Sequence, residues 1–243
     1  MNFYAVIIGT EILNGRRIDK HFDFLKNELA KYGQELFASF VIKDDVGLMK
    51  RTYKMILDDK EAVMFSFGGI GSTPDDLTRE VASEVFRNSM PVTHEKFKQD
   101  IIKKFGDEAY PHRIHMAEIP PNAELLPNPV NNMSGFALDR RFFFMPGFPS
   151  MSHPMSSEII KKYFSQAKKK YRYTLLAETS ENTLIDVMQK LPKNIELSSL
   201  PIFIENKPNV ELSLSGESKE EVKKYFDMFQ EELTRKHIPF KIS

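Results

Sequence analysis

The sequence predicts an α/β fold, built on a mostly parallel sheet and followed by a smaller α+β domain. Three observations support this prediction. Short apolar runs alternate with helical periodicities over residues 1–90 in the order βαβαβα, which is typical of parallel strands joined by right-handed crossovers. A Gly-rich turn follows the third apolar run. Beyond residue 170 the order becomes βαββαβ, the split βαβ pattern.

The elements of the first ninety residues follow from their periodicities. Continuous apolar stretches rich in β-branched residues predict buried strands at 3–8, 35–42 and 62–67. Helical spacing of apolar residues predicts helices at 22–32, 45–57 and 77–86, and Gly33 ends the first of them. Residues 9–19 are expected to form a polar loop.

The remaining elements divide at a basic tripeptide, Lys168-Lys169-Lys170, which places the domains at residues 1–167 and 171–243. The first domain is expected to continue with a helix at 93–105 capped by Thr93, a strand at 123–126, a hairpin of 135–138 with 141–145, and a helix that runs to about 167. The second is expected to contain strands at 171–178, at 195–199 or as far as 204, at 210–214 and at 238–242, with helices at 182–191 and 218–236.

Composition excludes several classes of function. Lys plus Arg equals Asp plus Glu, at 34 each, so no net charge favours nucleic acid or a membrane surface. The chain has no cysteine, which excludes disulfides, a thiolate nucleophile and Cys-ligated zinc, and fits a cytoplasmic protein. Neither a signal peptide nor a membrane-spanning apolar stretch is evident.

The turn at 68–78, Gly-Gly-Ile-Gly-Ser-Thr-Pro-Asp-Asp-Leu-Thr, is the most informative segment. Its glycines allow positive φ and a close approach of backbone to ligand, and exposed N–H groups at a helix start attract phosphate. Asp75 and Asp76 would repel a phosphate unless a cation lay between them. The turn therefore indicates a phosphorylated ligand held partly through a divalent metal ion. Alternatively, Thr73-Pro74-Asp75-Asp76 has the pattern of an ordinary helix start, with Thr73 as N-cap.

Four loops are expected at one rim, because ligands bind beyond the carboxyl ends of parallel strands. They begin at Gly9, Asp44, Gly68 and Pro146. Each loop taken alone is also explained as a helix cap or a turn without any ligand. Their shared location at one rim favours a ligand-binding site. The pattern does not contain the third Gly of the dinucleotide-binding fingerprint, nor a P-loop.

At these loops the chain resembles the molybdopterin-binding superfamily of MoaB and MogA, and is similar to the N-terminal part of CinA-like (competence/damage-inducible) proteins. The matching segments are 9–15, 41–45, 68–80, 126–130, 135–136 and 145–150. The resemblance implies a three-layer α/β fold with the ligand at the rim, and a KH-like second domain. That domain lacks a G-x-x-G loop, so RNA binding is not expected. Since the chain ends at Ser243, the deamidase domain and activity of longer CinA proteins are expected to be absent.

The resemblance also implies a function, a metal-dependent nucleotide pyrophosphatase that acts on ADP-ribose or a related nucleoside diphosphate compound. Asp76 and Asp45 are the expected catalytic residues, with Glu11, Asp44, Asp75 and Asp76 as ligands of Mg²⁺ or a similar ion. The expected substrate-binding residues are Gly9, Thr10, Gly68, Gly69, Gly71, Ser72, Thr73, Pro146 and Gly147.

Two alternatives remain open at this point. One is a protein of molybdenum cofactor biosynthesis that binds or adenylylates molybdopterin. The other is a non-catalytic ligand-binding or assembly protein, which three departures from the family pattern favour: Lys20, His21 and Met151. By analogy with the family, a homodimer is expected.

Overall fold

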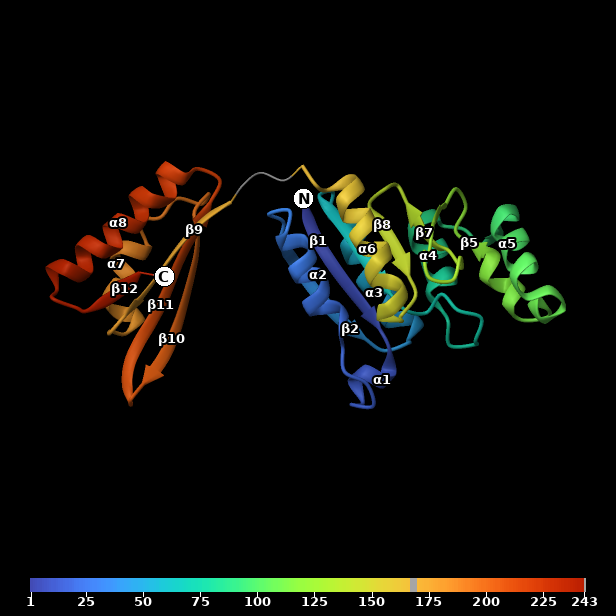
Figure 1. The fold of residues 1–243 in the computed structure, drawn as a ribbon, viewed down its shortest axis with the longest axis horizontal. Coiled ribbons are helices and arrows are strands. Elements are labelled where there is room, and N and C mark those ends of the chain that lie inside the picture. The colour runs from blue at the N-terminus through green and yellow to red at the C-terminus, as the bar shows by residue number, and fades with distance from the viewer. Residues whose placement is uncertain (167–169, 243) are drawn as a thin grey trace. The chain divides into compact units, whose positions relative to one another are not determined.

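The computed structural model describes residues 1–166 and 170–242, and the chain divides into two compact units, Met1–Ala167 and Lys168–Ser243 (Figure 1). The first two lysines of the predicted domain boundary, Lys168 and Lys169, lie outside the described residues.

Unit 1 contains a six-stranded sheet in the order β2-β1-β3-β8-β7-β6. Its strands are β1 (Asn2–Ile8), β2 (Leu36–Ile42), β3 (Ala62–Phe67), β6 (Glu124–Leu126), β7 (Gly135–Leu138) and β8 (Phe142–Met145). Strands β2, β1, β3 and β8 run parallel, and β7 pairs antiparallel with both β8 and β6. The mostly parallel sheet and the β7–β8 hairpin expected from the sequence are confirmed.

Helices cover both faces of this sheet, so unit 1 has three layers (Figure 1). The side chains of β1 alternate between two cores, as the pleat of a strand requires. One core contains residues of α3 (Val46–Asp58) and α4 (Thr78–Arg87), and the other contains residues of α2 (His21–Ala30) and α6 (Pro149–Tyr163). This is the three-layer architecture that the family resemblance implies.

A smaller substructure extends from the edge of unit 1, with α5 as its most distant helix (Figure 1). It consists of β4 (Val92–Thr93), α5 (Glu95–Phe105), the 3₁₀ turns η1 (Gly106–Ala109) and η2 (Arg113–Ala117), and β5 (Glu118–Ile119). The prediction of Thr93 as N-cap is wrong, because Thr93 pairs with Glu118 in the β4–β5 ladder. His94 caps α5 instead, its Nδ1 accepting the N–H of Phe97 at 3.3 Å.

Unit 2 is a four-stranded antiparallel sheet with helices packed into one core. Its elements are β9 (Tyr171–Ala177), η3 (Glu181–Leu184), α7 (Ile185–Met188), β10 (Glu196–Ile204), β11 (Lys207–Gly216), α8 (Lys219–Arg235) and β12 (Phe240–Ile242). The order β10-β11-β9-β12 confirms the split βαβ prediction, although the expected helix at 182–191 is a 3₁₀ turn followed by a short α7. Strand β10 is an edge strand with exposed apolar side chains, including Phe203 at 76%.

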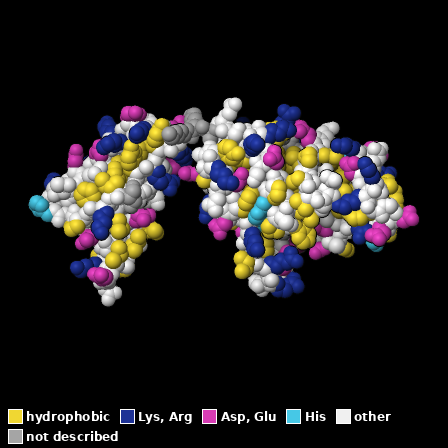
Figure 2. All heavy atoms as spheres, viewed as in Figure 1, with side chains coloured by type: hydrophobic (Ala, Val, Ile, Leu, Met, Phe, Trp, Pro, Cys, Tyr) yellow, Lys and Arg dark blue, Asp and Glu magenta, His cyan; other side chains and the backbone are white. Residues whose placement is uncertain are grey.

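Two further elements differ from expectation. The loop at 9–19 contains a one-turn helix, α1 (Thr10–Leu13), and α6 ends at Tyr163 rather than near residue 167. On the face seen in Figure 2, basic and acidic side chains are interspersed. None of the helices within residues 1–166 and 170–242 is long and apolar enough to cross a bilayer.

Candidate functional site

A pocket of about 520 Å³ opens in unit 1 beyond the carboxyl ends of its four parallel strands, where open α/β sheets bind ligands. Loops that follow β1, β2, β3 and β8 all contribute to it. Most of the predicted site residues line this pocket: Gly9, Glu11, Asp44, Gly68, Gly69, Gly71, Ser72, Thr73, Asp75, Asp76, Pro146 and Gly147. The structure therefore brings together the segments that the sequence places far apart.

The Gly-rich turn after β3 needs glycine at its first two positions. Gly68 has φ 104°, and a Cβ there would lie 2.5 Å from the carbonyl oxygen of Ile8. Gly69 has φ 67°. The turn is tied to α4 by Thr78, whose hydroxyl donates to the Gly68 carbonyl and whose N–H donates to that of Gly69, both at 2.9 Å.

Helix α4 starts at Thr78, which confirms the helix predicted at 77–86. The alternative interpretation of Thr73 to Asp76 as its first residues is wrong, because residues 73–76 form a separate turn that Asp76 closes. Oδ2 of Asp76 accepts both the N–H and the hydroxyl of Thr73, at 2.8 and 2.6 Å. Because only Oδ2 is used, Oδ1 of Asp76 has no hydrogen bond within the described residues.

Four consecutive N–H groups of this turn are free to bind an anion. Within the described part of the chain, residues 69–72 donate no backbone hydrogen bond to a protein acceptor, whereas the N–H of Thr73 is occupied by Asp76. These four residues line the pocket. Arg79, buried on α4, donates a hydrogen bond to the carbonyl oxygen of Gly71. This bond is a second link between the turn and α4. A run of backbone N–H groups without a protein acceptor is a common feature of phosphate sites.

Asp44 and Asp45 have different surroundings. Asp44 lines the pocket, and its Oδ2 accepts the N–H and the hydroxyl of Thr10, at 2.9 and 2.8 Å. Thr10 itself does not line the pocket and acts through Asp44. Asp45 also does not line the pocket, since its Oδ1 accepts the N–H of Leu48 as the N-cap of α3. The expected role of Asp45 as a base is therefore not supported by its position.

The surroundings of Asp75 favour its ionised form. The neighbouring Thr73 side chain, together with the backbone N–H of Asp75 itself, lowers the pKa of the exposed Asp75 below its ordinary value. Even so, the carboxylates do not form a ready metal site. No group of three or more His, Asp or Glu side chains in residues 1–166 or 170–242 is arranged to hold a metal ion.

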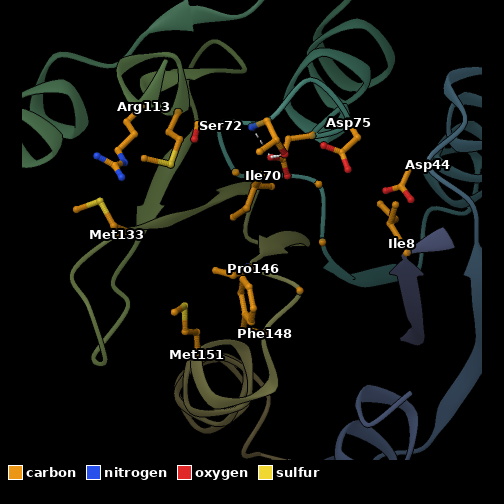
Figure 3. A pocket seen from close by; sticks show the side chains of 18 of the residues that line it. Ile8, Asp44, Ile70, Ser72, Asp75, Arg113, Met133, Pro146, Phe148 and Met151 are labelled. Carbon is orange, nitrogen blue, oxygen red and sulfur yellow. Dashed lines mark hydrogen bonds between the residues drawn. The ribbon is translucent and has the colours of Figure 1, made fainter. Parts of the chain in front are cut away.

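The other end of the pocket is apolar, and sequence reasoning missed it. Figure 3 shows Met133, Phe148 and Met151 gathered on one side, with Asp44 and Asp75 on the other. The apolar lining also includes Phe97, Phe105 and Met116, and Arg113 and Arg17 add positive charge. These residues come from segments with no shared motif, so no local pattern identifies them.

Two histidines lie behind the pocket wall. His21 is buried, stacks on Phe67 with ring centroids 4.4 Å apart, and places Nε2 3.2 Å from the carbonyl oxygen of Gly147. His153 stacks on Phe24 with centroids 3.8 Å apart and meets His21 edge-on. Burial lowers the pKa of His21, and burial with the nearby His21 lowers that of His153 to about 4. Both rings therefore support the wall in neutral form.

Comparison with known proteins gives consistent matches. The family described as "Probable molybdopterin binding domain" matches residues 4–166. A CinA-like protein of Acaryochloris marina is 31% identical over 65% of this chain and 39% of its own length. Protein Ta0487 of Thermoplasma acidophilum is 26% identical over 90% of this chain and 89% of its own. The crystal structure of the protein CinA, of unknown function, from Thermoplasma acidophilum aligns with a TM-score of 0.60 and 28% identity over 66% of this chain and 98% of that one.

The chain thus spans about two fifths of the length of the first CinA-like relatives, at 39% of each. The matched region is the one that carries the pocket and its loops. Through residues 4–166, the chain belongs to the molybdopterin-binding domain family, as a CinA-like member.

Proposed function

We propose that unit 1 binds a nucleoside diphosphate compound such as ADP-ribose in this pocket and hydrolyses its pyrophosphate link with a divalent cation. The observation that carries the proposal is the convergence of acidic side chains from three distant loops beside a free row of N–H groups. The row of N–H groups can bind one phosphate of the ligand. The carboxylates can bind a cation that accompanies the pyrophosphate.

The donor set fits a cation that the substrate helps to hold. Mg²⁺ is commonly bound by one or two carboxylates together with substrate phosphates, which agrees with the absence of a three-residue cluster in the described ranges. Asp44 and Asp76 each keep Oδ1 without a protein hydrogen bond among the described residues, because threonine occupies only Oδ2. A cation bound there would offset the charge of the pyrophosphate and make a nearby water more acidic.

The chain's own residues have separate roles in this proposal. The N–H groups of residues 69–72 hold a phosphate, Thr10 and Thr73 orient Asp44 and Asp76, and Asp75 adds negative charge toward the cation. Asp45 is left as a helix cap.

The test measures AMP from ADP-ribose with and without Mg²⁺, for the wild type, Asp76→Asn and a control, Asp58→Asn, at an exposed acid on the end of α3. Asparagine at position 76 can still accept from Thr73, so the turn should persist while the charge is lost. We expect Mg²⁺-dependent AMP formation that falls at least about 100-fold in Asp76→Asn only. No Mg²⁺-dependent AMP in the wild type, or full activity in Asp76→Asn, overturns the proposal.

A second candidate is a protein that binds a phosphorylated pterin, such as molybdopterin, without hydrolysis. The family match favours it. Calorimetry that shows tight pterin phosphate binding, with no AMP from ADP-ribose, would select it over the first. Binding of ADP-ribose without turnover would instead indicate a non-catalytic protein. The homodimer stays a prediction, which light scattering would test.

A further inference from the structure

The outer face of the unit 2 sheet, opposite its helices, carries a row of apolar side chains. Helices α7 and α8 pack in the core on the inner face, which also buries Val210 and Leu214 of β11. Val210 and Leu214 pair with odd-numbered residues of β10, so the even-numbered residues of β10 point to the outer face. Among these are Leu200, Ile202 and Ile204.

These apolar side chains are accessible. Leu200 and Ile204 are 54% and 43% exposed, and Ile202 is half-buried between them. The solvent-facing side of an antiparallel sheet is ordinarily polar, because its apolar residues are directed to the core. An apolar row on that side therefore indicates that another surface covers it.

The row continues onto an arm that two strands form without a third. Strand β9 pairs with β11 from Val210 to Gly216 only, whereas β10 and β11 stay paired as far as Ile204 and Lys207. The end of this hairpin therefore projects from unit 2 (Figure 1). A two-stranded ribbon is only marginally stable in water by itself, so a layer packed on its apolar side would stabilise it.

Two opposite charges flank the apolar row on the same face. Lys207 and Glu211 of β11 lie opposite Ile204 and Leu200 of β10, so they share the outer face. Both charged side chains are exposed, and neither forms an ion pair with another described residue. Asn209 lies midway between them. The arm face, which is the outer face of residues 200–211, is therefore apolar along β10 and carries one charge at each end along β11.

We propose that the arm face binds the arm face of a second copy of this chain across a twofold axis. The axis runs across the strands at Asn209 and reverses their direction. Ile204 then faces Leu200 of the second copy, and Lys207 faces its Glu211, with each contact made twice. A twofold contact requires a surface that complements itself, and this face does so in both its apolar and its charged positions. The expected homodimer thereby gains a specific surface.

This surface lies on unit 2, so the test is independent of the ligand and the reaction proposed for unit 1. It measures the dimer dissociation constant of the full chain by sedimentation velocity. Lys207→Glu or Glu211→Lys alone brings like charges together at both pairs, and each should weaken the dimer about tenfold. The double variant, with both changes, restores opposite charges across the axis and should recover the wild-type dissociation constant.

A matched pair of substitutions tests the apolar row. Leu200→Ser removes an apolar contact from the arm face and should also weaken the dimer about tenfold. Phe203→Ser is the control, because Phe203 is 76% exposed but occupies an inner-face position of β10. Its dissociation constant should equal that of the wild type. Circular dichroism checks that each variant is folded.

The absence of cysteine from the chain allows the axis itself to be located. Ile202 is level with Asn209, so it should face its own copy across the separation of about 10 Å between packed sheets. Ile202→Cys should therefore form a covalent dimer with a short bismaleimide, and Phe203→Cys should not.

The arm face is overturned as the interface by a wild type that stays monomeric at its highest soluble concentration, or by a double charge variant that dimerises as weakly as the single ones. Equal effects of Leu200→Ser and Phe203→Ser, or no preferential cross-linking of Ile202→Cys, overturn it as well. A dimer that persists unchanged in all the variants would place the contact elsewhere on the chain and would likewise overturn it.

Discussion

Thr10 donates two hydrogen bonds to one oxygen of Asp44, from its N–H at 2.9 Å and from its hydroxyl at 2.8 Å. This contact joins the loops after β1 and β2 and leaves the second oxygen of Asp44 available on the pocket side. The orientation of an acid in the candidate site thus depends on a residue that does not line the pocket.

Thr10→Val removes the hydroxyl bond and keeps the backbone bond. If Asp44 helps to hold the cation, the Mg²⁺ concentration for half-maximal AMP formation should rise about tenfold, as expected when an outer partner of a metal ligand is lost. Thr10→Ser keeps the hydroxyl and is the control. If Thr10→Val needs the same Mg²⁺ concentration as the wild type, Asp44 does not help to hold the cation.

Gly68→Ala should destabilise unit 1 by about 3 kcal/mol or more, because the added Cβ meets the Ile8 carbonyl and the residue keeps a positive φ. Gly15→Ala is a matched control: φ is 78° there, but no atom lies within 4 Å of the added Cβ, so only about 1 kcal/mol is expected. Urea denaturation of both variants measures the difference. Equal losses would mean that the close approach of the turn to β1 costs nothing.

Stability should decrease in mild acid because of His153. Folding lowers the pKa of His153 from 6.5 to about 4, so between these pH values the unfolded chain binds a proton that the folded chain does not. The stability from this residue is complete above pH 6.5 and is lost as the pH falls toward 4. The buried His21, whose pKa is also lowered, adds to the same trend.

His153→Phe keeps a ring to stack on Phe24 but cannot titrate. The loss of unfolding free energy between pH 7 and pH 5 should be smaller in this variant than in the wild type. The two proteins should differ in this loss by less than the uptake of one full proton on unfolding would give, because His153 is only half-buried and solvent weakens the shift of its pKa. Identical pH profiles would show that His153 is protonated in the folded protein as readily as in the unfolded one.

The two units should fold independently. The buried core residues of unit 2 form a cluster separate from those of unit 1. Fragments 1–166 and 170–243, produced separately, should each unfold cooperatively when followed by circular dichroism, and fragment 1–166 should retain any AMP-forming activity. A fragment that melts without cooperativity would show that its core needs the other unit.

The sheet of unit 1 was predictable because its strands are uninterrupted apolar runs, and burial on both faces requires such runs. The convergence of Glu11, Asp44 and Asp76 at one pocket followed from the topology of parallel strands. The apolar spacing predicted the start of α4 to within one residue, whereas the cap pattern at Thr73 and Pro74 pointed to an earlier start. A cap pattern alone does not reveal that Asp76 hydrogen-bonds back to Thr73 rather than leaving Thr73 to begin the helix.

Other features depend on contacts that are distant in the sequence. Thr93 had the right chemistry for a cap, but its pairing with Glu118 moved that role to His94. The apolar end of the pocket combines Phe97 with Met133 and Phe148, and only the three-dimensional arrangement brings them together. A single sequence indicates which side chains of a helix are apolar and turned inward. It does not indicate which of them line a pocket rather than the closed core.

Edge strand β10 has a practical consequence for handling the protein. It pairs on one side only, with β11, and presents Leu200 and Phe203 at 54% and 76% exposure, so concentrated samples carry a risk of strand-to-strand association and precipitation. Pro201 lies in the middle of this strand, and a proline on an edge strand withholds the N–H that an incoming chain would need. Replacing Pro201 to improve expression or crystallisation would therefore remove a natural safeguard against aggregation.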